Sequence, residues 1–219
     1  MKIKNITIEN WRSIKNLNIN TKAITTFVGK NNNGKSNILS AILFFFGEIP
    51  KVNELDFNDR TKEIFIEVCF HELDDKDKQQ FKKYVSPIGE LSVKKTANTQ
   101  FEVEYKGYIE VPCLEHLREE NISKYLAREK ATIFPFHDSL PATGKLLKDV
   151  VRQHLNDYIE ANKATIAFER RLENTHFMGN KNIAQGMLGE VLHIPPISSA
   201  PDELHAKGNT AFNKLSTRW

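Results

Sequence analysis

The fold of this 219-residue chain is decided by the stretch Gly29-Lys30-Asn31-Asn32-Asn33-Gly34-Lys35-Ser36. The stretch has glycine at its first and sixth positions, followed by lysine and serine, so it fits the pattern G-x-x-x-x-G-K-S/T at every fixed position. Glycine permits a tight wrap of the backbone and its close approach to a ligand. The pattern therefore predicts a loop that binds phosphate groups.

The segments on both sides of this loop are those that phosphate binding needs. Ile24–Val28 is a short β-prone run, and from Lys35 onward apolar residues lie nearly all round a helix. Gly47 and Pro50 end that helix. We expect a strand, a glycine loop and a buried helix in this order, so that backbone N–H groups and the helix N-terminus face the phosphates.

ATP with Mg²⁺ is the ligand that we expect in the loop. Lys35 is the expected catalytic residue, because its ammonium would neutralise β- and γ-phosphate oxygens, and the Ser36 hydroxyl is the expected Mg²⁺ ligand. Gly29 and Gly34 would let the backbone approach the phosphates. The alternative is a glycine turn that matches the pattern by chance.

Hydrolysis needs two further groups, a carboxylate on Mg²⁺ and a group that orients the attacking water. Downstream of the loop the sequence has no apolar strand that ends in Asp or Asp-Glu. Glu67 lies inside a strand-like run and comes too early in the chain. The sequence therefore predicts half of an ATPase site.

The rest of the chain alternates between strand-like and helix-like patterns. Strands are expected where Ile6 and Ile8 alternate with polar neighbours and where Leu17 and Ile19 do the same. Further strands are expected over Ile64–Phe70, Leu91–Lys95, Phe101–Val111 and 190–194, with a bulge or bend at Gly107. Helices are expected over Asp74–Tyr84, Cys113–Lys130 and Thr143–Lys163, followed by a less regular stretch over Ala164–Gln185.

These patterns predict an α/β fold, a P-loop sheet with an antiparallel portion and a helical insertion. We expect three parts: residues 1–112 as the N-terminal lobe of a P-loop ATPase, 113–188 as the helical insertion, and 189–219 as a return strand with a polar tail. The tail would lead to a C-terminal half of the ATPase lobe that the chain lacks.

Composition is typical of a soluble globular protein, with 40% hydrophobic and 27% charged residues. The net charge of +3 neither requires nor excludes contact with DNA. Cys69 and Cys113 have no metal-binding spacing, and this cysteine usage fits a reducing cytoplasm. Met1–Asn5 does not resemble a signal peptide, and the longest apolar run, Ala41–Phe46, is too short to span a bilayer. No membrane role is expected.

Other polar residues have ordinary interpretations. The seven histidines show no zinc-ligand spacing. The pairs Lys82-Lys83, Lys94-Lys95 and Arg170-Arg171 could contact DNA phosphates, but a solvated surface pair is the preferred interpretation. For Asp56 and Asp59, after the loop helix, a role in a turn is preferred to one in the metal site.

Two segments carry a further signal: Ile6-Thr7-Ile8-Glu9-Asn10-Trp11-Arg12-Ser13-Ile14 and Phe27-Val28-Gly29-Lys30-Asn31-Asn32-Asn33-Gly34-Lys35-Ser36-Asn37-Ile38-Leu39. Together they resemble the opening of the RecF/SMC/OLD group of ABC-type ATPases. The asparagine-rich loop is most similar to that of the OLD (overcoming lysogenization defect) family of ATP-dependent endonucleases. A weaker similarity lies at Leu192-His193-Ile194-Pro195-Pro196-Ile197.

The resemblance implies roles for further residues around the loop. Arg12 and Ser13 would approach the base, ribose or phosphates of the nucleotide, and an ordinary solvated turn residue is the alternative for Arg12. Asn31, Asn32 and Asn33 belong to the loop that would line the phosphates. Asn37 would share the phosphate and Mg²⁺ roles of Lys35 and Ser36. The preference for adenine over guanine also rests on the resemblance.

The resemblance further implies the N-terminal, ATP-binding lobe of an OLD-like DNA endonuclease. Its partners would be ATP, DNA and a Toprim-like nuclease domain outside this chain. Two lobes would enclose ATP in a homodimer, with a further implied role in antiviral defence. The isolated chain would then turn over little ATP. The alternatives are a RecF- or SMC-like DNA-binding ATPase without a nuclease, and a nucleotide-binding module that is inactive on its own.

Overall fold

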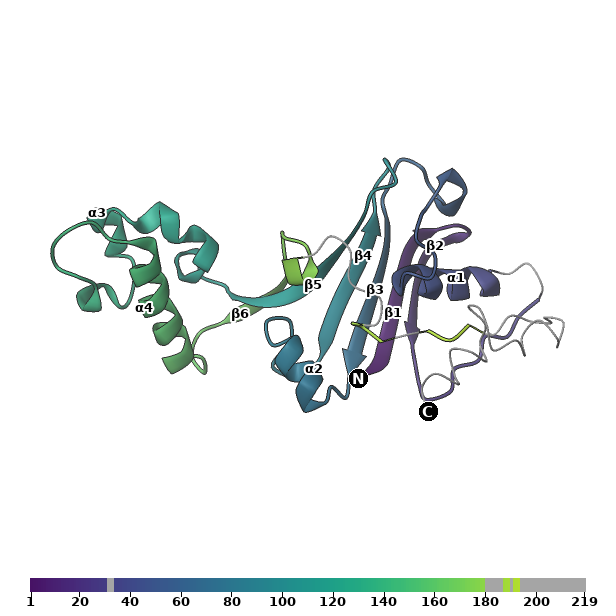
Figure 1. Cartoon of the computed structure of the whole chain (residues 1–219), viewed down its shortest axis with the longest axis horizontal. Helices are drawn as coiled ribbons and strands as arrows, with labels where there is room; N and C mark the ends of the chain where they lie inside the picture. The colour runs from purple at the N-terminus through teal and green to yellow at the C-terminus, as the bar shows by residue number, and fades with distance from the viewer. Residues whose placement is uncertain (31–33, 180–186, 190, 194–219) are drawn as a thin grey trace, which may run out of the picture.

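A six-stranded antiparallel sheet with strand order β2-β1-β3-β4-β5-β6 forms the body of the molecule (Figure 1). The computed structural model describes residues 1–30, 34–179, 187–189 and 191–193. The strands are β1 (Lys2–Trp11), β2 (Ile14–Asn20), β3 (Ile64–His71), β4 (Leu91–Ala97), β5 (Val103–Pro112) and β6 (Phe168–Leu172). The α-helices are α1 (Lys35–Phe45), α2 (Asp75–Gln80), α3 (Arg128–Ala131) and α4 (Lys148–Ala161). The 3-10 helices are η1 (Glu54–Asp56), η2 (Glu115–Leu117), η3 (Glu119–Tyr125), η4 (His137–Ser139) and η5 (Phe177–Gly179).

One face of the sheet packs against α1. Alternation along β1 and β3 puts Ile8 opposite Ile66 on this face, and both side chains are fully buried. Trp11, at the end of β1, stacks on Phe44 of α1 with ring centroids 4.9 Å apart. This core fixes the helix that follows the predicted phosphate loop, and the predicted α/β fold with an antiparallel sheet is confirmed.

The strand predictions for the N-terminal half are largely confirmed. The two alternating runs in the first 20 residues are β1 and β2, and the three runs predicted between residues 64 and 111 are β3, β4 and β5. The buried helix after the glycine loop is confirmed as α1. The helix predicted over Asp74–Tyr84 is shorter: α2 starts after Asp74, whose side chain caps it, and Phe81 ends it.

The strand predicted immediately before the loop is wrong. Residues 25–30 have no regular secondary structure, and the side chains of Ile24 and Val28 are 86% and 90% exposed. A β-prone segment becomes a strand only when a neighbouring strand supplies hydrogen-bond partners. None of the six strands in the described part of the chain pairs with this segment.

Strand β5 changes its partner halfway along. Val103–Gly107 pairs with β4, and Tyr108–Pro112 pairs with β6. Of the bulge or bend predicted at Gly107, the pairing with β4 shows no bulge, since its register runs without a shift up to this residue. Glycine is required there by packing: a Cβ atom would lie 2.3 Å from Cδ1 of Tyr84 and 2.7 Å from Cδ2 of Phe177.

A helical unit, residues 113–167, lies beyond the ends of β5 and β6 (Figure 1). It has a hydrophobic core of its own, in which Leu117, Ile122, Phe134, Val151 and Leu155 are buried. This core contains none of the residues of the sheet core. The two strands β5 and β6 therefore connect two separately packed parts of the molecule.

Three predictions in this half of the chain need correction. The helix predicted over Cys113–Lys130 is a series of short turns, in which buried Asn121 donates its side-chain amide to the backbone carbonyl of Glu115 (2.9 Å). The helix predicted from Thr143 begins only at Lys148, since Gly144 takes a positive φ of 80°. The stretch from Ala164 contains a strand, β6, whose charged residues obscure its alternation.

The end of the chain is described only in part. Residues 191–193 have no regular secondary structure, so the strand predicted over 190–194 is not found there, and residues 190 and 194–219 lie outside the described residues. Among the described helices, none combines the length and apolar character needed to cross a bilayer.

Candidate phosphate-binding site

The turn between β1 and β2 meets the N-terminus of α1. Gly34, the residue before α1, has a φ of 79°, and a Cβ atom there would lie 3.1 Å from the hydroxyl oxygen of Ser13. The side-chain amide of Asn37 donates a hydrogen bond of 2.8 Å to the same oxygen. Glycine at position 34 is thus required both by its backbone angle and by the closeness of Ser13.

The N-terminus of α1 has no side-chain cap and no acidic residue in its first turn. The backbone N–H groups of Asn37 and Ile38 bind the carbonyl oxygen of Gly34, at 2.9 and 3.2 Å. The first N–H groups of a helix point out of its end and carry partial positive charge. An anion at this end of α1 would meet favourable potential without competition from a carboxylate of the first turn.

Lys35 reaches back to the first two residues of the loop. Its ammonium donates hydrogen bonds of 2.7 Å to the backbone carbonyls of both Gly29 and Lys30. Ser36, the next residue, is exposed in the first turn of α1. The structure therefore brings Gly29, Gly34 and Lys35 together, as the sequence pattern requires.

A chain of hydrogen bonds joins this turn to the core. The amide of Asn37 reaches Ser13, the backbone carbonyl of Asn37 accepts from the Ser40 hydroxyl (2.9 Å), and that hydroxyl accepts from the indole N–H of Trp11 (2.9 Å). Sequence reasoning missed the roles of Trp11 and Ser40. The signal was available, since a buried indole usually finds a hydrogen-bond acceptor.

Arg12 is held by the segment after α1 and is not the solvated turn residue of the alternative interpretation. Its Nε donates to a carboxylate oxygen of Asp56 (2.9 Å), and its backbone N–H donates to the carbonyl of the same residue (2.7 Å). The amide of Asn58 donates to the Arg12 carbonyl (2.6 Å). Asp56 is 4% exposed and also accepts from the backbone of Asn53, so it has the expected turn role in addition to the ion pair.

The remaining predicted site residues stand as follows. Asn31, Asn32 and Asn33 lie outside the described residues. Ser13, Gly34, Lys35, Ser36 and Asn37 gather at the N-terminus of α1, and Arg12 adjoins them on the β1–β2 turn. Within the described ranges, no group of three or more His, Cys, Asp or Glu residues could hold a metal ion.

The C-terminal end of α1 is bound by side chains from the sheet. Lys95 of β4 donates its ammonium to the backbone carbonyl of Phe44, and the hydroxyl of Tyr105 donates to that of Phe45. Lys95 is 3% exposed, so the interpretation of Lys94-Lys95 as a solvated pair is wrong for this residue. Burial lowers the pKa of Lys95 to about 7.

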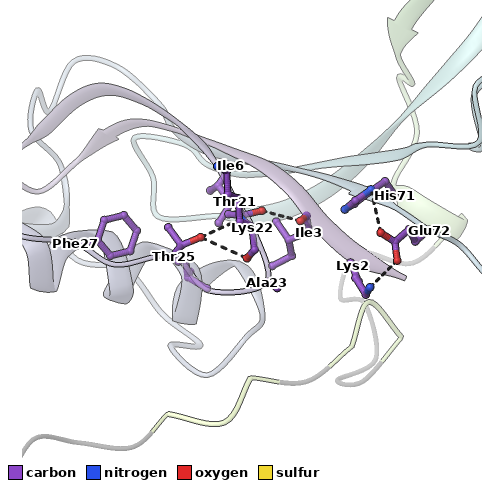
Figure 2. A pocket seen from close by; sticks show the side chains of 11 residues that line it. Lys2, Ile3, Ile6, Thr21, Lys22, Ala23, Thr25, Phe27, His71 and Glu72 are labelled. Carbon is purple, nitrogen blue, oxygen red and sulfur yellow. Dashed lines mark hydrogen bonds and ion pairs between the residues drawn. The ribbon is translucent and has the colours of Figure 1, made fainter.

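A pocket of about 670 Å³ borders the segment that leads into the loop (Figure 2). Thr21 donates its hydroxyl to the carbonyl of Ile3 (2.6 Å), and the Thr25 hydroxyl accepts from the backbone N–H of Lys22 (3.0 Å). On the far wall, Lys2 and Glu72 form an ion pair (2.6 Å). The pocket shares no lining residue with the turn and the helix N-terminus described above, so it is a separate feature.

Among the solved structures similar to the chain are two that each have a TM-score of 0.37. One, described as "Structural biochemistry of ATP-driven dimerization and DNA stimulated activation of SMC ATPases", is 20% identical, and the match covers 73% of this chain and 99% of that one. The other, an SmcHead bound to the C-winged helix domain of ScpA, is 13% identical over 87% of this chain and 72% of that one. No curated protein matches the chain.

A family model described as AAA ATPase domain matches residues 1–185. These residues include the β1–β2 turn, the loop and α1, as well as the helical unit and β6. Since the match covers well over half of the 219 residues, the chain belongs to the AAA ATPase domain family.

Proposed function

We propose that residues 29–37, together with Arg12 and Ser13, bind ATP and Mg²⁺, and that the chain is the ATP-binding lobe of an OLD-like ATP-dependent DNA endonuclease. One observation carries the ATP site: the Lys35 ammonium binds the carbonyls of Gly29 and Lys30 beside a helix N-terminus that no side chain caps. Membership of an ATPase family supports ATP as the nucleotide.

The residues present fit a triphosphate. The positive φ of Gly34 and its closeness to Ser13 leave room for backbone only, as a loop needs when it wraps an anion. The first turn of α1 offers outward-facing N–H groups and no carboxylate that would repel the ligand. The positive charge of Lys35 adds to this field.

Lys35 would exchange its present partners for the ligand. Its ammonium is held by two neutral carbonyl oxygens of the loop, those of Gly29 and Lys30. Bonds from an ammonium to ionised phosphate oxygens pair two opposite charges, whereas its present acceptors carry no net charge. The Ser36 hydroxyl, exposed beside Lys35, is the group that would contact Mg²⁺.

Bound ATP supplies the phosphoanhydride bond whose cleavage needs a carboxylate on Mg²⁺ and an oriented water. The residues of this chain bind and orient the triphosphate. Glu67 does not take the carboxylate role, because its side chain accepts a hydrogen bond from the Tyr108 hydroxyl (2.6 Å) within the sheet. Our expectation remains that the isolated chain binds ATP and turns over little of it.

The DNA-directed part of the proposal rests on the sequence resemblance of residues 6–14 and 27–39. A homodimer that closes on ATP, a Toprim-like nuclease outside this chain and a role in antiviral defence all belong to it. Sequencing of the gene beyond codon 219 tests the nuclease. An aspartate-rich Toprim pattern in that sequence would support the OLD assignment. A continuation of the ATPase without that pattern would support the RecF- or SMC-like alternative.

The binding site is tested by titration of ATP and Mg²⁺ into wild type and Lys35→Ala. We expect the variant to lose at least about tenfold in affinity, since it loses a charge-assisted bond. Lys51→Ala is the matched control, because it removes an exposed lysine that follows α1. Equal affinities for wild type and Lys35→Ala would show that this loop is not the nucleotide site.

A further inference from the structure

Helix α1 is held at both of its ends. At its N-terminus lie Gly34 and the proposed phosphate site. At its C-terminus the carbonyl of Phe44 accepts from the Lys95 ammonium, and that of Phe45 accepts from the Tyr105 hydroxyl. Lys95 and Tyr105 are directly paired across β4 and β5, so two adjacent strands hold two consecutive carbonyls.

Lys95 occupies a position where the strand alternation calls for an apolar residue. Val93 and Ala97, two residues away on either side, are fully buried on the same face of β4. The ammonium lies 4.0 Å from the ring centroid of Phe44 and 4.7 Å from that of Tyr105, in a cation–π arrangement. Burial of a lysine ammonium costs free energy unless the ammonium finds hydrogen-bond acceptors or other groups that stabilise its charge.

The charge of Lys95 complements the helix. The last turn of α1 contains no basic residue of its own, and the C-terminus of a helix carries partial negative charge. Lys95 supplies a cation to that end from a different element of the fold. The helix has 11 residues, or about 16 Å at 1.5 Å per residue, so a tilt at its C-terminus would displace its N-terminus.

We infer that Lys95 and Tyr105 are positioning residues for nucleotide binding: by anchoring the C-terminal carbonyls of α1, they hold its N-terminal N–H groups toward the phosphates. This inference rests on the proposed function. Neither residue touches the nucleotide site, and both act through α1.

The protonation of Lys95 provides a readout for this role. Burial lowers its pKa to about 7, so the positive charge is lost in an accessible pH range. The titratable group that faces it is the Tyr105 hydroxyl of β5, whose pKa is raised by burial. Ile66, the residue of β3 that pairs with Lys95, is apolar. Lys35, at the opposite end of α1, is the only charged residue of that helix. A change in affinity near pH 7 that depends on residue 95 is therefore assigned to Lys95.

The test compares the Kd for ATP, with Mg²⁺ in excess, in wild type and Lys95→Met at about pH 6 and about pH 9. At the lower pH we expect wild type to bind about two- to fivefold more tightly than Lys95→Met, the effect of one charge at a helix end. At the higher pH the ratio of the two Kd values should fall toward one, since Lys95 is then neutral. A constant ratio across this pH range would overturn the inference.

Two further variants make the result decisive. Tyr105→Phe should weaken binding about twofold at both pH values, because it removes one anchor and leaves Lys95 in place. Should Lys95→Met fail to fold, Tyr105→Phe still decides: an affinity for ATP equal to that of wild type at both pH values contradicts the inference. Lys35→Ala separates the two proposals, because binding that is insensitive to Lys35 contradicts the nucleotide site itself, whatever Lys95 does.

Discussion

The indole N–H of Trp11 donates a hydrogen bond of 2.9 Å to the hydroxyl oxygen of Ser40 inside the core. Trp11 ends β1, and Ser40 lies in α1, one helical turn after Ser36. The Ser40 hydroxyl in turn donates to the carbonyl of Asn37, whose amide holds Ser13. The bond therefore ties the rigid sheet to the turn and the helix end that form the proposed phosphate site.

Ser40→Ala should destabilise the protein through this bond. The variant leaves a buried indole donor without its acceptor, so we expect the free energy of unfolding to fall by about 1–3 kcal/mol in urea titrations. Trp11→Phe combined with Ser40→Ala removes both partners, and the double variant should lose less than the sum of the single losses. Strictly additive losses would show that the bond contributes nothing.

Gly34→Ala should impair nucleotide binding beyond its effect on stability. A Cβ at this position strains a backbone with φ of 79° and lies 3.1 Å from the Ser13 hydroxyl, so the loop or the turn must shift. Gly89→Ala is the matched control, because Gly89 has a φ of 76° and nothing within 4 Å of the added atom. Gly89→Ala should lose about 1 kcal/mol of stability and Gly34→Ala at least as much, but only Gly34→Ala should bind ATP more weakly. A similar loss of affinity in both would contradict the assigned role of Gly34.

The parts of the fold that are readable from sequence are those set by local patterns. Alternation in β1 and β3 and the glycine, lysine and serine of the loop are visible along the chain. The exposed segment around Ile24 was misread, since strand formation depends on a partner that its own residues do not reveal.

Contacts between distant residues explain the other errors. Asp56 pairs with Arg12 across 44 positions, and Lys95 reaches a carbonyl 51 positions away, so neither partner is visible in a local window. Strand β6 contains Glu169, Arg170 and Arg171, which hide its period, and it forms because β5 extends far enough to pair with it. In each case tertiary contact outweighed local propensity.

Arg12 can be tested apart from its ion pair. Arg12→Ala removes the guanidinium and leaves the buried Asp56 carboxylate unpaired, whereas Asp56→Asn keeps the guanidinium and removes the acceptor charge. Each should lower the free energy of unfolding, by about 1–3 kcal/mol. If Arg12 contacts the nucleotide, only Arg12→Ala should weaken ATP binding several-fold in addition. Equal affinities for the two variants would limit Arg12 to a structural role.

Gly107→Ala should be among the most destabilising single-methyl changes in the sheet. The added Cβ would lie 2.3 Å from the ring of Tyr84, which is itself held by a hydrogen bond from its hydroxyl to Glu173 (2.8 Å). The ring cannot move without loss of that bond, so we expect a loss of about 1–3 kcal/mol or more in denaturant titrations. Gly144→Ala, in open space, should show only the effect of its positive φ.

Stability should depend on pH through Lys95, in the direction opposite to ATP affinity. The pKa of Lys95 is about 7 in the folded protein and has an ordinary value of 10.5 when the chain unfolds. Between these values the unfolded chain binds more protons than the folded one, so the free energy of unfolding rises with pH in this window. Below pH 7 both states are protonated, and the full penalty of the buried charge is present.

Urea titrations of wild type and Lys95→Met between about pH 6 and about pH 10 measure this penalty. The difference in free energy of unfolding, wild type minus variant, should increase as the pH rises across the window. The contributions of all other ionisable groups are common to both proteins and cancel in this difference. Over the same window the advantage of wild type in ATP affinity should shrink. A residue that merely stabilised the fold would move both quantities together, so a parallel rise of stability and affinity would leave Lys95 without a positioning role.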